Sequence, residues 1–275
     1  MSSITQLVTS LPLFWAAVLA SLIAGLAAGV GALPVLVVNR ASRRLQDVLL
    51  GTAAGIMLAA TCFSLLLPGL QIAAVQTSSV LGGALLVGIG IMAGAVGLWL
   101  MHRCVPHEHI VKGKESLGGG MLSPQRVRRI WLFVLAITLH NIPEGLAVGV
   151  GVASGDSVAG MAVTLGIFLQ NLPEGFVVAL AMLPLGWSRL QAILLALATG
   201  AVETVGGLIG AGAVTLSAAV LPWALAGAAG AMLFVISHEI IPETHENGHE
   251  TPATFGIVGG FVVMMLLDVA LGTTA

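Results

Sequence analysis

Charged residues are scarce in this sequence. Only 8% of its 275 residues are Asp, Glu, Lys or Arg, whereas 57% are hydrophobic. A soluble domain carries roughly a quarter charged residues, so this chain has too few to cover the surface of a water-soluble globule. The surplus of apolar side chains must therefore face lipid, and the composition favours one integral membrane domain.

Cysteine and an N-terminal positive charge are scarce as well. The two cysteines, Cys62 and Cys104, make no disulfide framework, and we expect both to have packing roles. The opening residues MSSITQLVTS contain no Lys or Arg, and the apolar run that follows is longer than the core of a signal peptide. We therefore expect this run to remain as a membrane-spanning helix.

The chain does contain apolar runs long enough to cross a bilayer, which takes about 20 helical residues. Its 36 glycines suit membrane helices whose backbones pack closely. Lipid tolerates only helices or closed barrels, and the alternation of barrel strands is missing, so the fold class is all-α. In one domain, 1–275, the predicted spans are residues 11–38, 48–70, 80–101, 130–152, 158–183, 190–216, 220–241 and 254–271.

All ten Lys and Arg residues lie in loops on one side of this eight-span arrangement. They follow the first span, fill the long loop 103–129, and separate the fifth span from the sixth. By the positive-inside rule these loops are cytoplasmic, and both termini are outside the cytoplasm. We therefore expect a multi-pass protein of the cell inner membrane.

Polar residues interrupt the middle of three predicted spans. The stretch TLHNIPEGLAVGV (138–150) lies in the fourth span, and the similar stretch FLQNLPEGFVVAL (168–180) lies in the fifth. An intramembrane charge costs about 2.5–3.5 kcal/mol on insertion scales, so several carboxylates at one depth indicate an ion or proton pathway. The residues concerned are His140, Asn141, Glu144, Gln170, Asn171, Glu174 and, in the sixth span, Glu203.

Spacing within the repeated motif supports a shared site. Each Glu follows the His or Gln by four residues and the Asn by three, so the side chains lie on one helix flank. Pro143 and Pro173 supply no N–H, which leaves the carbonyls of Leu139 and Leu169 without helical partners and predicts irregular backbone around a cavity. Consecutive spans are antiparallel, so the repeat predicts a pseudo-two-fold site at the midplane, as in many secondary transporters.

The ligand types in this cluster favour a metal. Imidazole, carboxylate and amide oxygen suit zinc, ferrous iron, manganese or cobalt rather than Cu(I), which prefers sulfur. Met57 is a candidate thioether ligand in the second span, although its spacing alone favours a packing role over a ligand role. The alternative is that the polar groups only hydrogen-bond the helices together, and the duplicated motif with a third glutamate argues against it.

HNIPEG followed by QNLPEG, with a glutamate in the next span, resembles the ZIP (ZRT/IRT-like) metal transporters, in particular their bacterial GufA-like branch. The resemblance extends over essentially the whole chain, including GTAAGIMLAATCFSLLLPG and SHEIIPETHENGHET. It implies uptake of divalent metal into the cytoplasm, with zinc first and iron, manganese, cadmium or cobalt as other substrates, and no cofactor. It also implies inverted repeats of spans 1–3 and 6–8 around spans 4 and 5.

The resemblance further implies two adjoining metal sites. The first consists of Met57, His140, Glu144, Gln170 and Glu174. The second consists of Asn141, Glu144, Asn171, Glu174 and Glu203. Some relatives carry aspartate where this chain has Asn171, so the second site here has one charge fewer.

Two outlying groups fit a conduction path. Asp268, near the outer end of the last span, would attract cations at the entrance, unless it merely reaches for water. Candidate ligands on the cytoplasmic exit side are His107, His109, His238, Glu239, His245 and His249, for which simple solvation is the competing interpretation.

Two other functions fit part of the pattern. An intramembrane zinc protease needs HExxH, but HEIIP has proline in place of the second histidine, and we predict no enzyme activity. A proton- or sodium-coupled transporter of an organic substrate explains the carboxylates but not the duplicated imidazole and amide groups. The expected partners are divalent metal ions and the lipid bilayer, with no nucleic acid, and a homodimer is one option for the assembly.

Overall fold

The computed structural model describes residues 11–38, 40–104, 124–246 and 248–271 of the chain. Eight helices in these ranges are long and apolar enough to cross a membrane. The expected all-α fold with eight spans is therefore confirmed.

Several of the spans are interrupted or extended by short helical segments. The first four spans are α2 (Leu13–Ala32) with a 3-10 turn at Leu33–Leu36, α3 (Arg43–Ala60) with α4 (Leu67–Gln76), α5 (Val80–Cys104) and α6 (Pro124–Ala153). The last four are α7 (Ser157–Met182), α8 (Arg189–Ala201) with α9 (Glu203–Leu216), α10 (Leu221–Val235) with α11 (Ile241–His245), and α12 (Glu250–Leu271).

Several helices run further than the apolar pattern indicates. The predicted loop 103–129 is partly helical, because α5 continues to Cys104 and α6 already begins at Pro124. Likewise α3 begins at Arg43, where the preceding Ser42 caps the helix by accepting a hydrogen bond from the Leu45 N–H at 3.2 Å. Charged residues in these end turns can reach water while the backbone stays helical, so hydropathy alone predicts helices that are too short.

Irregular backbone occurs in other places than predicted. Helices α6 and α7 continue through Pro143 and Pro173, whereas wider π-helical turns occur at Thr61–Leu66 and Ile236–Ile240. Each π segment ends two residues before a proline, Pro68 or Pro242 respectively. In spans 2 and 7, a π turn accommodates the missing N–H of the proline. In spans 4 and 5, the helix continues through the proline, with neighbouring helices packed around it.

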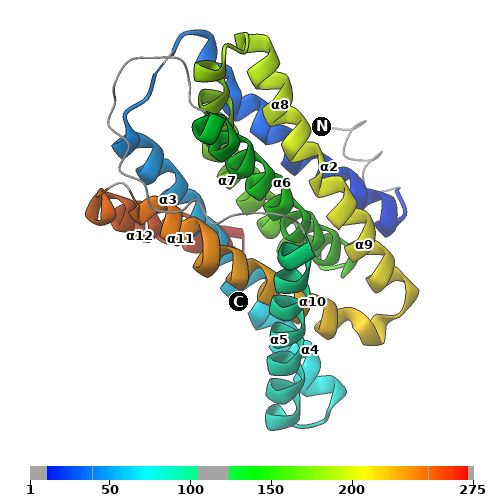
Figure 1. Ribbon diagram of the computed structural model, residues 1–275. Coiled ribbons are helices and arrows are strands. Elements are labelled where there is room, and N and C mark those ends of the chain that lie inside the picture. The colour runs from blue at the N-terminus through cyan, green and yellow to red at the C-terminus, as the bar shows by residue number, and fades with distance from the viewer. Residues whose placement is uncertain (1–10, 39, 105–123, 247, 272–275) are drawn as a thin grey trace.

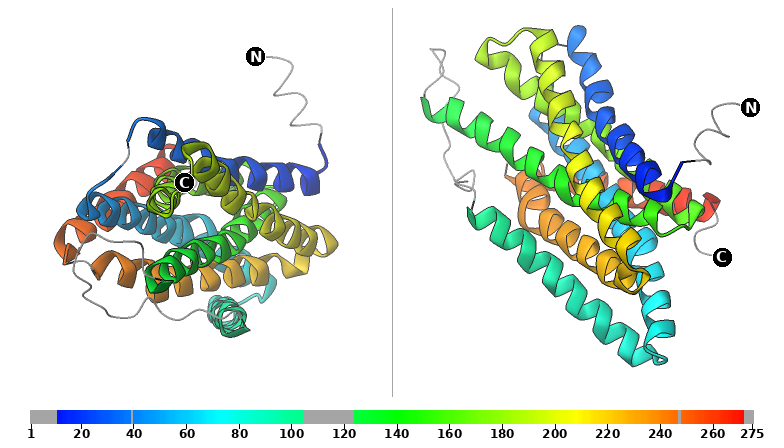
Figure 2. Two further views of the ribbon diagram at one scale, coloured as in Figure 1. Left: turned by 45° about the horizontal axis from the view of Figure 1, so that its top comes forward. Right: turned by 90° about the vertical axis from the view of Figure 1, so that its right-hand side faces the viewer.

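The helices pack in two arrangements (Figures 1 and 2). Helix α2 packs against α6, α7, α8 and α9, and α6 packs against α7 and α9, which makes one bundle of spans 1, 4, 5 and 6. Beside it, α3 pairs with α12 and α5 pairs with α10. The pairs meet the bundle where α3 contacts α7 and α10 contacts α6. Exchanging spans 1, 2 and 3 with 6, 7 and 8, and span 4 with span 5, reproduces this pattern.

Glycine contacts confirm the repeat at the level of single residues. A side chain on Gly55 of α3 would meet the carbonyl oxygen of Ile257 in α12 at 1.9 Å. One on Gly230 of α10 would meet that of Ile91 in α5 at 2.0 Å. The helices touch backbone to backbone at both crossings, which is possible only because glycine has no side chain. The implied inverted repeat is thus visible in which residues touch, and the two glycines lie in the similar stretches AAGIML (53–58) and AAGAML (228–233).

We call the loop side the membrane side on which spans 1 and 2, 3 and 4, 5 and 6, and 7 and 8 are joined. The opposite side is the terminal side, where α2 begins and α12 ends (Figure 2, right). All predicted basic loops are on the loop side.

Candidate metal site

The polar residues of the two motifs are all buried inside the bundle of spans 1, 4, 5 and 6. None of His140, Asn141, Glu144, Gln170, Asn171, Glu174 and Glu203 is more than 4% exposed. Glu144 is electrostatically linked to Glu174 and Glu203 and lies beside the Gln170 amide, and Glu174 is linked to His140. The structure therefore brings together residues from α6, α7 and the first turn of α9.

Close helix crossings position the motif carboxylates. A side chain on Gly145 would meet the carbonyl oxygen of Glu203 at 1.8 Å, and one on Gly175 would meet that of Ala28 at 1.9 Å. The glycine that follows each motif glutamate thus lets α6 touch α9 and lets α7 touch α2. This contact explains why glutamate and glycine are adjacent in both motifs.

The two motif asparagines are fixed by their amide nitrogens. Asn141 donates from Nδ2 to the carbonyl oxygen of Thr199 at 2.6 Å, and Asn171 donates from Nδ2 to that of Ala24 at 2.9 Å. Asn171 Nδ2 also donates to the carboxylate of Glu203. Because the nitrogens are engaged with neighbouring helices, the amide oxygens are the atoms left for a cation.

Several buried oxygens in the cluster have no hydrogen bond of normal geometry within the described part of the chain. They are both carboxylate oxygens of Glu144, Oε2 of Glu174, Oε2 of Glu203 and Oδ1 of Asn171. Burying a polar atom without a partner costs about 1–3 kcal/mol, and more for a charged group. Packing alone would not retain four such residues together, and a bound cation would satisfy all of them.

The cluster is loose before any ion is considered. In the residues that the structure describes, no three His, Cys, Asp or Glu side chains converge tightly enough to hold a metal. His140 Nε2 lies 2.5 Å from Oε2 of Glu239, a residue of the π segment Ile236–Ile240. Glu239, predicted as an exit ligand, therefore contacts the cluster itself.

A cavity of about 120 Å³ connects this cluster with the loop side. His140 and Glu174 line its inner part, and α6 contributes apolar residues such as Phe133. The remaining polar lining comes from the end of span 7, namely His238, Glu239, Glu243 and Glu246. Of the predicted exit residues, His238 and Glu239 therefore face the path, and Glu243 and Glu246 are additions that the histidine-rich pattern did not single out.

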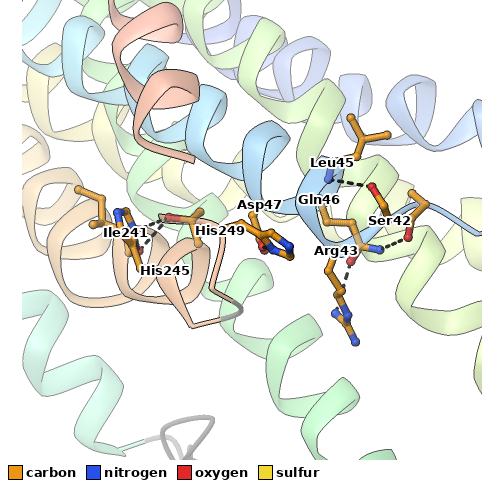
Figure 3. Close-up of polar contacts among 10 residues, drawn as sticks. Ser42, Arg43, Leu45, Gln46, Asp47, Ile241, His245 and His249 are labelled. Atoms are coloured by element: carbon orange, nitrogen blue, oxygen red, sulfur yellow. Dashed lines mark hydrogen bonds and ion pairs between the residues drawn. The ribbon is translucent and has the colours of Figure 1, made fainter. Parts of the chain in front are cut away.

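The other predicted exit histidines have different surroundings (Figure 3). His245 Nδ1 lies 2.7 Å from the carbonyl oxygen of Ile241 in its own helix. His249 Nδ1 lies 2.8 Å from Oδ2 of Asp47, a buried residue of α3. Neither histidine lines the cavity, so the structure does not bring them to the cluster. His107 and His109 lie outside the described residues.

Apolar side chains separate the cluster from the terminal side. On α7, Val163 and Ile167 lie between Gln170 and the helix start, and both are fully buried. They belong to the same core cluster as Met57 and Met232, which are also fully buried. The role of Met57 as a ligand stays a prediction, because its side chain is packed in this apolar core.

On the terminal side, Asp268 does not reach water. It is fully buried, and Oδ1 accepts a hydrogen bond from Ser64 Oγ at 2.9 Å. The interpretation of Asp268 as a solvated helix-end residue is therefore wrong, because Ser64 of the neighbouring span 2 provides its partner. Ser64 also lines a cavity of about 80 Å³ on this side, together with Asp156.

Comparison with known proteins adds an independent finding. The family described as "ZIP Zinc transporter" matches residues 105–268. Zinc transporter GufA of Myxococcus xanthus is 48% identical over 257 residues, which is 94% of this chain and 99% of that protein. Zinc transporter ZIPB of Bordetella bronchiseptica is 45% identical over 250 residues, 90% of this chain and 79% of that protein. Zinc transporter ZIP11 of Homo sapiens is 34% identical, and the match covers 88% of this chain and 93% of that protein.

Proposed function

Because this chain belongs to the ZIP zinc transporter family, we propose that it carries divalent metal cations across a membrane, with zinc as the main substrate. The observation that carries this proposal is the buried cluster of three glutamates, each of which has at least one oxygen without a hydrogen-bond partner among the described residues. Relatives that align over nearly the whole chain are named zinc transporters, which supports zinc as the ion.

The ligands of the transported ion come from both motifs. Met57, His140, Glu144, Gln170 and Glu174 make the first metal position. Asn141, Glu144, Asn171, Glu174 and Glu203 make the second, in which the two asparagines offer oxygen because their nitrogens are bound to neighbouring helices. Glu144 and Glu174 have two oxygens each and serve both positions. Cadmium, ferrous iron, manganese and cobalt accept the same mixed ligands and are the secondary substrates.

The direction of transport is into the cytoplasm. The cavity that reaches His140 and Glu174 opens on the loop side, and the concentration of basic residues in these loops marks that side as cytoplasmic. The apolar residues Val163, Ile167 and Met232 close the opposite side. This arrangement fits a carrier that faces the cytoplasm, in an inner membrane, with both termini outside the cytoplasm. A homodimer stays a prediction of its own.

Glu239 has a role in releasing the ion. Its carboxylate contacts His140 at the inner part of the cavity, and Glu243 and Glu246 follow toward the loop side. A series of carboxylates along a polar cavity gives a cation several weak sites in succession, which permits both entry and departure.

Proteoliposomes test the proposal. The purified protein is reconstituted around a dye that responds to each of the ions tested, and Zn²⁺, Cd²⁺, Fe²⁺, Mn²⁺ and Co²⁺ are added in turn, with and without a pH gradient. Uptake of Zn²⁺ faster than into protein-free vesicles, lost in Glu144→Ala, is the expected result. If none of these ions enters faster than into empty vesicles, divalent metal transport is excluded as the function.

A further inference from the structure

The contacts between spans 5 and 1 repeat those between spans 4 and 6. Gly175 touches the carbonyl oxygen of Ala28 just as Gly145 touches that of Glu203. The two glycines hold the same place in the repeated motif, NLPEG and NIPEG. Ala28 in α2 is therefore the counterpart of Glu203 in α9.

The asparagine contacts give the same correspondence. Asn171 donates to the carbonyl oxygen of Ala24, four residues before Ala28. Asn141 donates to that of Thr199, four residues before Glu203.

Two further glycine crossings agree with it. A side chain on Gly31 would meet the carbonyl oxygen of Leu172 at 2.0 Å. One on Gly206 would meet that of Ile142, also at 2.0 Å. Gly31 lies three residues after Ala28, and Gly206 lies three residues after Glu203. The correspondence of Ala28 with Glu203 therefore holds for the contacts on both sides of these residues.

The pseudo-two-fold axis passes between Gly25 and Gly200, each of which would meet the other's carbonyl oxygen, at 2.1 and 2.0 Å. A Cβ on Gly25 would lie 3.4 Å from the Cβ of Glu203, and one on Gly200 would lie 3.0 Å from the Cβ of Ala28. The side chains at positions 28 and 203 thus leave their helices on opposite sides of one crossing.

The chemistry at the two positions differs although the geometry is shared. Glu203 accepts a hydrogen bond from Asn171 and keeps a second, buried oxygen without a partner among the described residues. Ala28 offers a methyl group, is 4% exposed, and leaves Asn141 without the equivalent carboxylate.

We propose that residue 28 is a specificity-determining position of the metal site, at which alanine withholds the carboxylate that the two-fold arrangement would place opposite Glu203 and beside Asn141. This inference rests on the proposed function, since it concerns the second metal position. With alanine there, the site has three buried carboxylates rather than four. A further carboxylate would hold the ion more tightly and would favour hard ions such as Mn²⁺ over Zn²⁺. The missing charge therefore keeps the ion releasable.

Moving the carboxylate across the axis tests the inference. Five full-length proteins are compared: the parent, Glu203→Ala, Ala28→Glu, the exchange variant Glu203→Ala with Ala28→Glu, and the uncharged control Glu203→Ala with Ala28→Gln. Calorimetric titration in detergent with Zn²⁺ and with Mn²⁺ gives the affinity and the number of ions bound. Ala28→Asp replaces Ala28→Glu in a parallel exchange variant, so that poor folding of the longer side chain does not decide the result.

We expect Glu203→Ala to weaken binding at the second position by roughly ten- to a hundredfold, the equivalent of one charged contact. An exchange variant should recover most of this loss and the glutamine control should not. Ala28→Glu in the parent should bind Mn²⁺ more tightly relative to Zn²⁺ and should transport more slowly.

The outcomes separate the inference from the function on which it rests. Exchange variants that are folded by thermal unfolding yet bind no better than Glu203→Ala would overturn the role of residue 28, while the parent still binds metal. No binding of either ion by the parent would overturn the proposed function, and the inference with it.

Discussion

The imidazole of His140 and the carboxylate of Glu239 lie in direct contact, 2.5 Å from nitrogen to oxygen, although 99 residues separate them in the chain. His140 belongs to α6 and Glu239 to the π segment of span 7. The contact joins the central bundle to the α5–α10 pair at the inner part of the loop-side cavity. A metal that uses His140 as a ligand must therefore compete with Glu239.

Removing this competitor should separate binding from transport. In Glu239→Ala we expect tighter Zn²⁺ binding at the cluster, because Nε2 of His140 is released, and slower uptake, because the first acceptor on the exit path is lost. An affinity gain of about tenfold corresponds to one charge-assisted hydrogen bond of about 1.5 kcal/mol. Calorimetry and liposome uptake measure the two effects. The control is His245→Ala, whose side chain does not line the cavity. Weaker binding in Glu239→Ala would show that this carboxylate is itself a ligand.

Replacing either motif glutamate should nearly abolish transport without lowering the stability of the protein. Glu144 and Glu174 are buried with oxygens that lack partners in the described residues, a cost of about 1–3 kcal/mol each. Glu144→Ala and Glu174→Ala should nearly abolish transport, while the metal-free variants unfold at the same temperature as the parent or higher. Added Zn²⁺ should raise the unfolding temperature of the parent only. Deleting residues 113–121 is the comparison, and it should change transport much less. Parent-like uptake by either glutamate variant would remove these residues from the site.

The motif glycines should be needed for assembly of the bundle. A Cβ at Gly145 or Gly175 would lie within 2 Å of a backbone carbonyl oxygen, which neither helix can avoid without moving. We expect Gly145→Ala and Gly175→Ala each to cost about 1–3 kcal/mol, as other overpacked positions do. Gly259→Ala is the matched control, since a Cβ there meets nothing within 4 Å. Thermal unfolding of the purified variants gives the comparison, and equal stability of all three would mean that these helices do not cross as closely as described.

The orientation in the membrane can be tested without any transport assay. With Cys62 and Cys104 replaced by serine, single cysteines are placed at Ser3 and at Ser123. Since three spans lie between Ser3 and Ser123, the two positions are on opposite sides of the membrane. An impermeant thiol reagent should therefore label position 3 from outside intact cells and position 123 only after permeabilisation. Labelling of both positions from one side would contradict the assigned topology and the direction of transport.

The sequence predicts the spans and the site residues because both depend on local signals. Apolar runs give the helices, and a charge inside such a run stands out at once. The helix irregularities do not follow in the same way, because Pro68, Pro143, Pro173 and Pro242 look alike in the sequence. Whether the helix forms a π turn before the proline depends on what packs against it, which is a property of the tertiary structure.

Pairings between distant residues could not be predicted either. The sequence identifies Glu239 as a polar residue near the exit, but only the crossing of α6 with span 7 places it against His140. Asp268 has a similar explanation, since its partner Ser64 is an inconspicuous residue in an apolar run. Ala28 carries no signal at all. Its importance follows from the glycine contacts that make it equivalent to Glu203.

Asn171 is the remaining position at which the structure sharpens a prediction. Its Nδ2 donates both to the carbonyl oxygen of Ala24 and to the carboxylate of Glu203. In Asn171→Asp an oxygen takes the place of this nitrogen, so two acceptors would face the new carboxylate and both hydrogen bonds would be lost. The metal-free variant should therefore be less stable than the parent, by about 1–3 kcal/mol for the buried acceptors left without a donor.

A bound cation should reverse this loss, because a carboxylate is a better ligand for hard and borderline ions than an amide. We expect Asn171→Asp to bind Zn²⁺ more tightly at the second position and to gain more thermal stability from Zn²⁺ than the parent does. Uptake should become slower, since a transport site must also release its ion. Thermal unfolding with and without Zn²⁺, calorimetry and liposome uptake report the three effects. Asn141→Asp is the paired control, because Asn141 has the equivalent backbone contact but no neighbouring carboxylate from position 28. A metal-free Asn171→Asp protein as stable as the parent, with unchanged Zn²⁺ affinity, would show that residue 171 faces away from the ion and that the second position is not used.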